Sequence, residues 1–374
     1  MGALEALLAL RALSHDRIHI TVLTASRHFT YPALSVAEPF GGGPAPRYDW
    51  AAIARDRGAE WVPDMVVGVR PEAHEIDTRD GPPLHYDALL LALGARPHPA
   101  LAGAITFAGP RDVLAIMEAI ERLAPGRRDT VAFVAPSGAG WTLPLYELAL
   151  LTADRARRTG LDLGLELVTP EPTPLAAFGA QAGVAVARRL ADAGIRLLTG
   201  TRAVEHAGGH LMLRGAPPLA VDLAIALPRL TGPAVAGLPC DADGFVAVDA
   251  YGRVLERADV WAVGDMTTHA LRQGGLAAQQ ADVAAASIAA HAGEAVAVAP
   301  YRPVLRGLLL TGSAPQYLER LPDASAVSHL PPAPEWWPPQ KVAGHHLAPY
   351  LESLGPRPTS RSGDHRPVGT GPIR

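Results

Sequence analysis

A stretch at residues 258–290 contains groups whose types and order suit the binding of a polar ligand. Residues 260–263 are apolar and predict a short strand, and Gly264 and Asp265 follow it directly. Glycine allows the chain to turn sharply because it has no Cβ. A carboxylate held at a strand end can accept a hydrogen bond from a hydroxyl group of a ligand.

The second half of this stretch predicts a helix whose start can face the same ligand. Gln273, Gly274 and Gly275 precede a long run of alanines and other small residues. The first N–H groups of a helix have no partner within the helix and lie at the positive end of its dipole. They therefore suit a phosphate or the electron-rich edge of a ring. The alternative is an ordinary strand–turn–helix in which the aspartate is only a cap.

Together these features resemble a motif of the flavoprotein reductases that carry two dinucleotide-binding domains, nearest the type II NADH:quinone and sulfide:quinone oxidoreductases. In that family the aspartate bonds the ribityl chain of FAD, and the helix start points at the pyrimidine edge of the flavin. The resemblance implies the first role for Asp265 and the second for Gly274 and Gly275. It places Gly264 and Gln273 in the same FAD site.

A second stretch supports this resemblance. Residues 88–93 form an apolar run that predicts a buried strand, and a close turn follows it. The stretch resembles the Ala-Thr-Gly segment of the same flavoproteins, in which small residues approach the cofactor. The resemblance implies that role for Ala92, Gly94 and Ala95, although Leu93 stands in the place of the threonine. The alternative is a plain strand end.

The beginning of the chain departs from the pattern of a dinucleotide-binding unit, which runs strand, Gly-x-Gly-x-x-Gly/Ala, helix, strand and acidic residue. Residues 1–11 predict a helix and residues 18–23 a strand. Gly2 and Ala3 match the end of the glycine fingerprint, and Thr24 falls where the acid is expected. We expect that the chain is shortened relative to its family, that upstream codons encode the missing strand and glycines, and that this chain binds FAD weakly.

A second unit of the same layout follows, with a strand at residues 130–135, a helix at 143–159 and a strand at 163–168. The resemblance implies NAD(P)H binding here, with Gly138 and Gly140 as the first two glycines. The fingerprint is degraded because Trp141 is bulky and Leu143 replaces the third glycine. Glu171 is a candidate for a ribose contact. The alternative is a dinucleotide-type fold that is kept as a scaffold.

The predicted fold class is α/β, with two Rossmann-like dinucleotide-binding domains of the three-layer ββα type, the second inserted in the first, and a small C-terminal region. The expected divisions are FAD domain 1–107 and 231–293, NAD(P)-like domain 108–230, acceptor or dimer region 294–354, and a disordered tail 355–374. Further predicted helices are 48–57 (capped by Asp49), 111–123, 181–193 and 347–354. Further predicted strands are 60–69, 74–78, 84–86, 196–198, 201–205, 210–213, 219–221, 224–227, 243–249, 251–253, 304–311 and 314–318.

Composition narrows the function further. The 374 residues carry a net charge of −4, which does not indicate nucleic acid as a partner. The single cysteine, Cys240, excludes an intramolecular disulfide and dithiol chemistry, and we expect a structural role for it. No signal peptide or apolar run long enough for a membrane span is evident, which predicts a cytoplasmic protein. No His or Cys spacing predicts a metal site, and His269 and His291 are expected to be surface or packing residues.

The first hypothesis is an FAD-dependent oxidoreductase that passes electrons from a small donor, with NAD(P)H the candidate, to a quinone or another small acceptor. Flavin chemistry needs few acid–base groups from the protein, so no catalytic side chain is assigned. Trp336 and Trp337 are candidates to flank an aromatic acceptor, with packing or a homodimer contact as alternatives. The second hypothesis is an inactive, flavoprotein-like binding scaffold, which the degraded glycine motifs favour.

Overall fold

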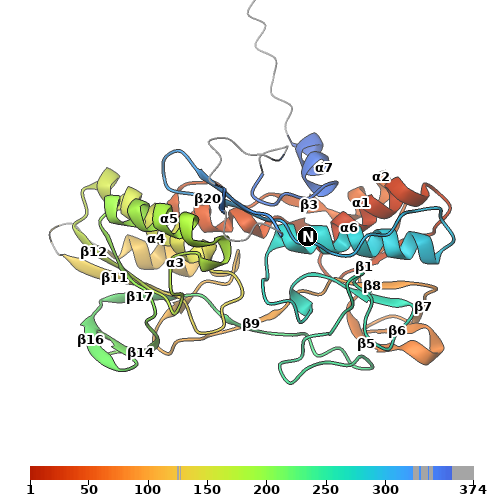
Figure 1. The fold of residues 1–374 in the computed structure, drawn as a ribbon, viewed down its shortest axis with the longest axis horizontal. Helices are drawn as coiled ribbons and strands as arrows, with labels where there is room; N and C mark the ends of the chain where they lie inside the picture. The colour runs from red at the N-terminus through yellow and green to blue at the C-terminus, as the bar shows by residue number, and fades with distance from the viewer. Residues whose placement is uncertain (124–125, 127, 323–327, 330–335, 337–339, 356–374) are drawn as a thin grey trace, which may run out of the picture.

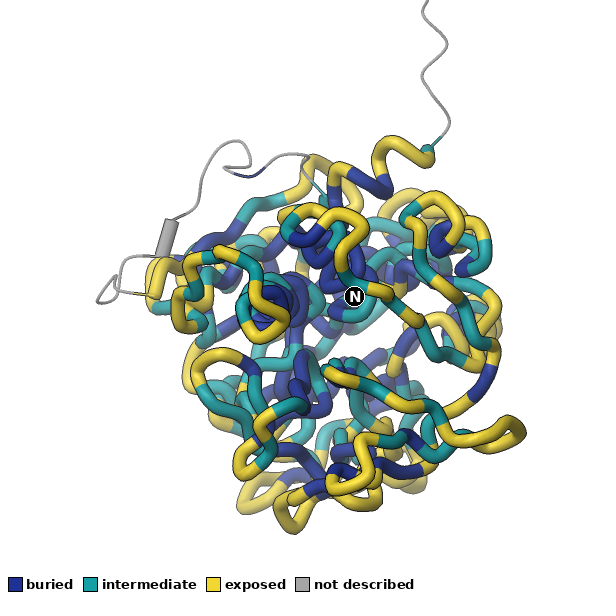
Figure 2. Tube along the Cα trace, turned by 90° about the vertical axis from the view of Figure 1, so that its right-hand side faces the viewer, coloured by how far each residue is buried: buried dark blue, intermediate teal, exposed yellow. Residues whose placement is uncertain are grey.

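The structure is a computed structural model that describes residues 1–123, 126, 128–322, 328–329, 336 and 340–355. It has two lobes side by side, each with helices over strands (Figure 1). The buried residues gather in the interior, and the loops at the rim are exposed (Figure 2). The predicted α/β fold class is confirmed. Within the described residues, no helix is long and apolar enough to cross a membrane.

The first lobe holds two pairs of parallel strands, β1 with β4 and β8 with β19, beneath helices α1 and α6. Small side chains let the two helices lie close together, because Ala6 and Ala9 of α1 share one core cluster with Ala281 and Ala284 of α6. The elements of this lobe are α1 (Gly2–Ser14), β1 (Thr21–Leu23), β2 (His28–Thr30), η1 (Pro32–Phe40), β3 (Arg47–Asp49), α2 (Trp50–Asp56), β4 (Glu60–Val62), β5 (Val66–Arg70), β6 (Glu75–Thr78), β7 (Leu84–His85), β8 (Leu89–Leu91), β19 (Val260–Ala262), η4 (Gly264–Met266) and α6 (Gly274–His291).

The second lobe is built on a parallel sheet with the strand order β10-β17-β11-β12-β13. Apolar side chains of β11 and α4 that are fully buried, such as Phe133 and Leu148, form its core. An antiparallel sheet of β14, β15 and β16 completes the lobe. Its elements are β10 (Ile105–Thr106), α3 (Val113–Glu121), β11 (Asp129–Val134), α4 (Leu143–Thr159), β12 (Leu163–Val168), α5 (Ala180–Asp192), β13 (Ile195–Leu198), β14 (Ala203–Ala207), β15 (His210–Leu213), β16 (Ala216–Ala220) and β17 (Leu223–Ala226).

The chain passes between the lobes twice, and the two passages pair with each other. β9 (Arg96–His98) leads out of the first lobe, β18 (Arg229–Thr231) leads back, and the two form an antiparallel pair. The C-terminal region adds β20 (Leu305–Leu309), β21 (Gln316–Arg320), β22 (Ser328–His329) and α7 (Leu347–Leu354). This region lies across both lobes, because β20 packs on the core of the second and α7 on that of the first.

Two element predictions are wrong. The strand predicted at residues 60–69 is divided into β4 and β5, because the side chain of Asp64 accepts hydrogen bonds from backbone N–H groups and bends the chain. Residues 243–249 and 251–253 form only isolated bridges instead of two strands. There the carboxylates of Asp241 and Asp249 bind nearby N–H groups and compete with strand pairing.

Most other predicted elements are confirmed within a few residues. The Asp49 cap is also confirmed, because its Oδ1 accepts from the N–H groups of Ala51 and Ala52 at the start of α2. The predictions for Trp337 and for residues 356–374 lie outside the described residues.

Candidate functional site

A cavity of about 340 Å³ lies where the two lobes and the C-terminal region meet. Its walls come from the first turns of α1, α4 and α6, from η1 and η4, from the loop after β8, and from β20 and Lys341. A volume of this size is within the range of small-molecule and cofactor sites. The cavity therefore brings together segments that are far apart in the sequence.

Two helix starts line this cavity, through Gly2 of α1 and Gly274 of α6. Both positions are closely packed, since a Cβ added to Gly2 would lie 2.8 Å from Val263 Cγ2, and one added to Gly274 would lie 3.0 Å from Val342. Gln273 caps α6 by accepting from the N–H of Leu276 at 2.8 Å. The positive ends of two helix dipoles thus face one space, which suits an electron-rich ligand.

Asp265 contributes an unpaired carboxylate to the same cavity. Gly264 turns the chain with φ of 75°, and its N–H donates to Gln280 Oε1 at 2.6 Å. Asp265 lines the cavity, and no donor in the described part of the chain hydrogen-bonds its carboxyl group. Burial raises the pKa of Asp265, while the charges of the Met1 amino group and of Arg272 act in the opposite direction. Asp265 is half-buried, and a carboxyl group in such a place that accepts no hydrogen bond can accept one from a ligand.

The structure divides the remaining predicted FAD residues. Ala92 and Gly94 line the cavity, and a Cβ at Gly94 would meet no atom within 4 Å. Ala3, Thr24, Ala95 and Gly275 do not line it.

The residues that face elsewhere have local roles. Thr24 directly follows β1, and its N–H donates to Val62 O. Gly275 is buried next to its own helix cap, because an added Cβ would lie 2.9 Å from Gln273 Oε1. Gly275 is therefore required by the cap.

The predicted nicotinamide glycines are also separated from the cavity. Gly138 has φ of 77° and no neighbour that a Cβ would meet, whereas Gly140 packs against residues 270–272. Its carbonyl oxygen accepts from the N–H of Arg272 at 3.2 Å, and an added Cβ would lie 3.2 Å from Ala270 O. Gly140 therefore allows the backbone to lie close to residues of the first lobe of the same chain.

Glu171, the candidate ribose contact, is satisfied by groups of this chain. Its carboxylate accepts from Tyr146 Oη at 2.7 Å and from Thr142 and Thr169 Oγ1 at 3.0 Å. It also accepts from the N–H of Ala176. The adjoining space, next to Gly140 and Trp141, has a volume of only about 60 Å³. Binding of a ribose here would have to break part of this hydrogen-bond network.

An ion pair at the cavity was not predicted from the sequence. The ammonium group of Lys341 donates to Glu147 Oε2 at 2.5 Å, and both side chains are almost fully buried. Glu147 Oε1 also accepts from the N–H of Leu310. Burial raises the pKa of Glu147, and Lys341 opposes that shift. The pair places a positive charge in the cavity wall.

The sequence does contain a signal for this pair. Lys341 is the only lysine in the chain, and all the other Lys or Arg positions, of 33 in total, are arginine. A single lysine among so many arginines indicates a position where lysine has a specific role.

The match to known families decides the assignment. The sequence profile described as pyridine nucleotide-disulphide oxidoreductase matches residues 1–287. The chain belongs to this family.

Solved structures with the same fold agree with membership of the pyridine nucleotide-disulphide oxidoreductase family. The sulfide:quinone oxidoreductase of the bacterium Aquifex aeolicus has a TM-score of 0.80 at 16% identity, over 94% of this chain and 87% of that one. The ferredoxin reductase for the CYP199A2 system of Rhodopseudomonas palustris has a TM-score of 0.65 at 19% identity, over 86% of this chain and 80% of that one. NDH2 of Plasmodium falciparum has a TM-score of 0.58 at 15% identity, over 71% of this chain and 62% of that one. The resemblance stated from the residues is confirmed.

The remaining candidate residues of this family member lie away from the cavity. Cys240 is exposed and does not line it. Trp336 is buried against Tyr317 with ring centroids 5.7 Å apart, and its Nε1 donates to Gln340 O. His291 contacts the ring of Trp261, and His269 that of Tyr301. These contacts agree with packing roles for the tryptophan and both histidines.

Proposed function

We propose that the cavity binds FAD and that the chain is an FAD-dependent oxidoreductase that passes electrons from NAD(P)H to a quinone or another small acceptor. The unpaired carboxyl group of Asp265, which faces the cavity between the starts of α1 and α6, carries this proposal. Family membership supports it, as do the names of similar structures, which include a quinone oxidoreductase and a ferredoxin reductase.

The residues of the cavity fit this cofactor. Asp265 is placed to accept a hydrogen bond from a hydroxyl of the ribityl chain, which would satisfy its half-buried carboxyl group. The small residues Ala92 and Gly94 leave room for a flat ring system. When bound, FAD supplies hydride and electron transfer, and the protein provides position and electrostatics.

Lys341 provides the electrostatic contribution of the chain. Lys341 lines the cavity, and its side chain is paired with Glu147, so it adds a polar, donating group to a wall that is otherwise largely apolar. The α6 start adds the positive end of a dipole to the same wall. We therefore infer that the cavity favours the electron-rich, reduced form of its ligand over the oxidised form.

A different observation favours the second candidate, a flavoprotein-like scaffold without nicotinamide-dependent activity. Gly140 is packed against residues 270–272, and the Glu171 carboxylate is already satisfied within the chain. A nicotinamide dinucleotide at this loop would compete with both arrangements. The two candidates differ in a simple result, since only the oxidoreductase bleaches its flavin absorption with NADH or NADPH.

Titration of the purified chain with FAD, followed by flavin fluorescence, tests the site. A hydrogen bond to a charged group contributes about 1.5–3 kcal/mol. Asp265→Ala should therefore weaken FAD binding roughly 10- to 100-fold. Asp243→Ala removes an exposed carboxylate outside the cavity and is the matched control. Equal FAD affinity in the two variants would show that Asp265 does not hold the cofactor.

A further inference from the structure

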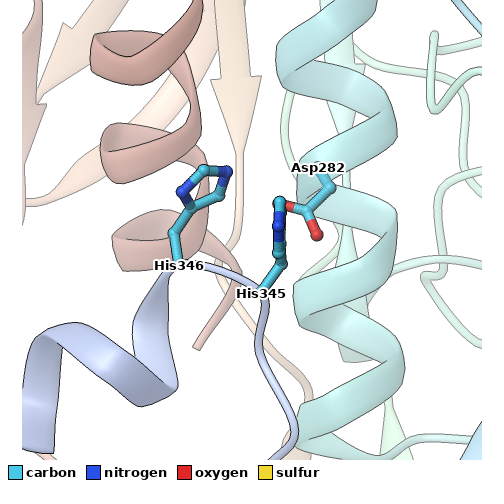
Figure 3. A group of neighbouring side chains, drawn as sticks. All are labelled: Asp282, His345 and His346. Carbon is cyan, nitrogen blue, oxygen red and sulfur yellow. The ribbon is translucent and has the colours of Figure 1, made fainter. Parts of the chain in front are cut away.

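Three side chains with metal-binding atoms lie together on the side of α6 that faces α7. Asp282 extends from α6, and His345 and His346 lie directly before the first turn of α7 (Figure 3). One ligand atom of each lies within 4.8 Å of the others. The adjacent histidines carry no metal-ligand spacing by themselves, and the carboxylate is more than 60 positions away in the sequence. The fold alone creates the group.

Several polar atoms of this group lack hydrogen-bond partners. Asp282 Oδ1 is buried and has no such partner among the described residues, although the carboxyl group of Asp282 also interacts with Glu5. Neither imidazole forms a hydrogen bond with any residue that the structure describes. The two rings instead lie with their centroids 4.3 Å apart. Metal-ligating atoms that are close together and unsatisfied point to a missing cation, because buried polar atoms normally have partners.

The charge around the group also suits a cation. Asp282 lies next to the carboxyl group of Glu5, and the two acidic groups interact. Glu5 is fully buried, and its carboxylate accepts from the N–H groups of His346 and Leu347 at 2.7 and 2.6 Å. Glu5 thus fixes the backbone that carries the histidines. A divalent cation would compensate these two neighbouring acidic groups.

We propose that Asp282, His345 and His346 bind one divalent first-row transition metal ion, with Zn²⁺ as the representative. Two imidazoles and a carboxylate form a ligand set of this class, with a position left for water. At metal–ligand distances of about 2.0–2.2 Å, tetrahedral ligand atoms lie about 3.4 Å apart. The ligand atoms must approach one another by up to about 1.4 Å, and His345 is exposed, so its side chain can adjust.

The ion would fasten the segment at residues 341–347 to α6. This segment supplies Lys341 and Val342 to the cavity wall, and the N–H of Val342 donates to Tyr31 Oη at 2.7 Å. Contacts with Glu147, Tyr31 and Glu5 already hold it at three places. The metal adds a fourth, so its structural effect should appear as rigidity of this segment.

Titration of the chelator-treated full chain with Zn²⁺ tests the site, with metal content and thermal midpoint as readouts. One equivalent should bind and raise the midpoint, since a ligand that binds only the folded state stabilises it. Loss of an outer-shell partner costs roughly 10- to 100-fold in metal affinity. Asp282→Asn and His345→Gln remove direct ligands and should weaken binding by at least about 100-fold. His291→Gln, an exposed histidine on the same helix, is the control and should bind as the unmodified chain does.

Hydrogen exchange gives a second readout that is independent of any activity. Zn²⁺ should slow exchange of the amides at residues 341–347 in the unmodified chain and in His291→Gln, and leave them unchanged in Asp282→Asn. Absence of a bound equivalent overturns the proposal. Equal binding by all variants also overturns it, because the ion would then be held elsewhere.

Discussion

The ion pair of Lys341 and Glu147 allows a stability prediction with a defined magnitude. Lys341→Met keeps most of the unbranched side chain and removes its charge. Lys341 is 6% exposed and Glu147 0%, so the variant leaves a buried carboxylate without its cation. Breaking a buried pair from one side costs about 3–5 kcal/mol. We expect Lys341→Met to lower the free energy of unfolding by that amount.

A surface pair of the same length provides the matched control. Arg157 binds Asp154 at 2.6 Å, but its side chain is 75% exposed, and Arg158 binds the same carboxylate. Exposed pairs contribute about 0–1 kcal/mol because water screens them. Arg157→Met should therefore lower stability by no more than about 1 kcal/mol. The difference in the free energy of unfolding between the two variants measures the effect of burial on the ion pair, because the N–O distances of the two pairs are similar.

The assay is equilibrium urea unfolding followed by circular dichroism, extended to a double-mutant cycle. Glu147→Gln removes the stranded charge and keeps an acceptor for the N–H of Leu310. Combined with Lys341→Met it should recover roughly 1–3 kcal/mol of the loss. A cost below about 1 kcal/mol for Lys341→Met, or no recovery in the double variant, would refute the reasoning.

The pH dependence of Lys341→Met gives a third check. Burial raises the pKa of Glu147 in the folded chain, and loss of the opposing ammonium raises it further. As the pH rises above about 4.3, the unfolded chain loses this proton while the folded chain retains it. The stability deficit of Lys341→Met should therefore grow with pH until it passes the folded pKa of Glu147. A deficit that is constant with pH would mean that Glu147 is not the source of the cost.

Three further predictions use other parts of the structure. Asp49→Ala removes the α2 cap and should cost about 1 kcal/mol in urea unfolding, with no loss if the cap is not formed. Gly237→Ala places a Cβ 1.8 Å from Val69 O at a φ of 85°, whereas Gly43→Ala has only the strain of a positive φ, about 1–2 kcal/mol. Gly237→Ala should therefore have a much lower melting temperature than Gly43→Ala. Equal melting temperatures would contradict the close packing at Gly237. Burial lowers the pKa of His269, so the unfolded chain gains a proton before the folded chain does as the pH falls below about 6.5, and the free energy of unfolding decreases there. His269→Gln should lose less stability over this pH range. The same pH profile in the variant and the unmodified chain would contradict this.

The fold was largely predictable because its main signals are local. The apolar strand at residues 260–263, the turn at Gly264 and the Ala-rich helix follow one another, and each has a periodicity or residue type that the backbone requires. The same reasoning located Asp265 and Gly94, which both line the cavity. The division of residues 60–69 was missed because the Asp64 side chain, which binds N–H groups as far away as Gly81, changes the local preference.

The site was predictable only in part because several of its contacts join distant residues. Lys341 and Glu147 are 194 positions apart, and nothing in either local sequence indicates the other. Gly140 is predicted as the second glycine of a nucleotide-binding fingerprint, but its close neighbour is Arg272 of the same chain. A glycine pattern states that a backbone is approached closely, and it does not state by what.

The segment at residues 341–347 has a consequence for where the protein can be shortened. Two fully buried glutamates, Glu5 in the first lobe and Glu147 in the second, find their partners in these seven residues. The family profile ends at residue 287, well before them. A polypeptide cut at that boundary would strand two interior anions at once. We therefore expect the smallest unit that folds by itself to extend through α7, because the region beyond residue 287 contributes buried contacts to both lobes.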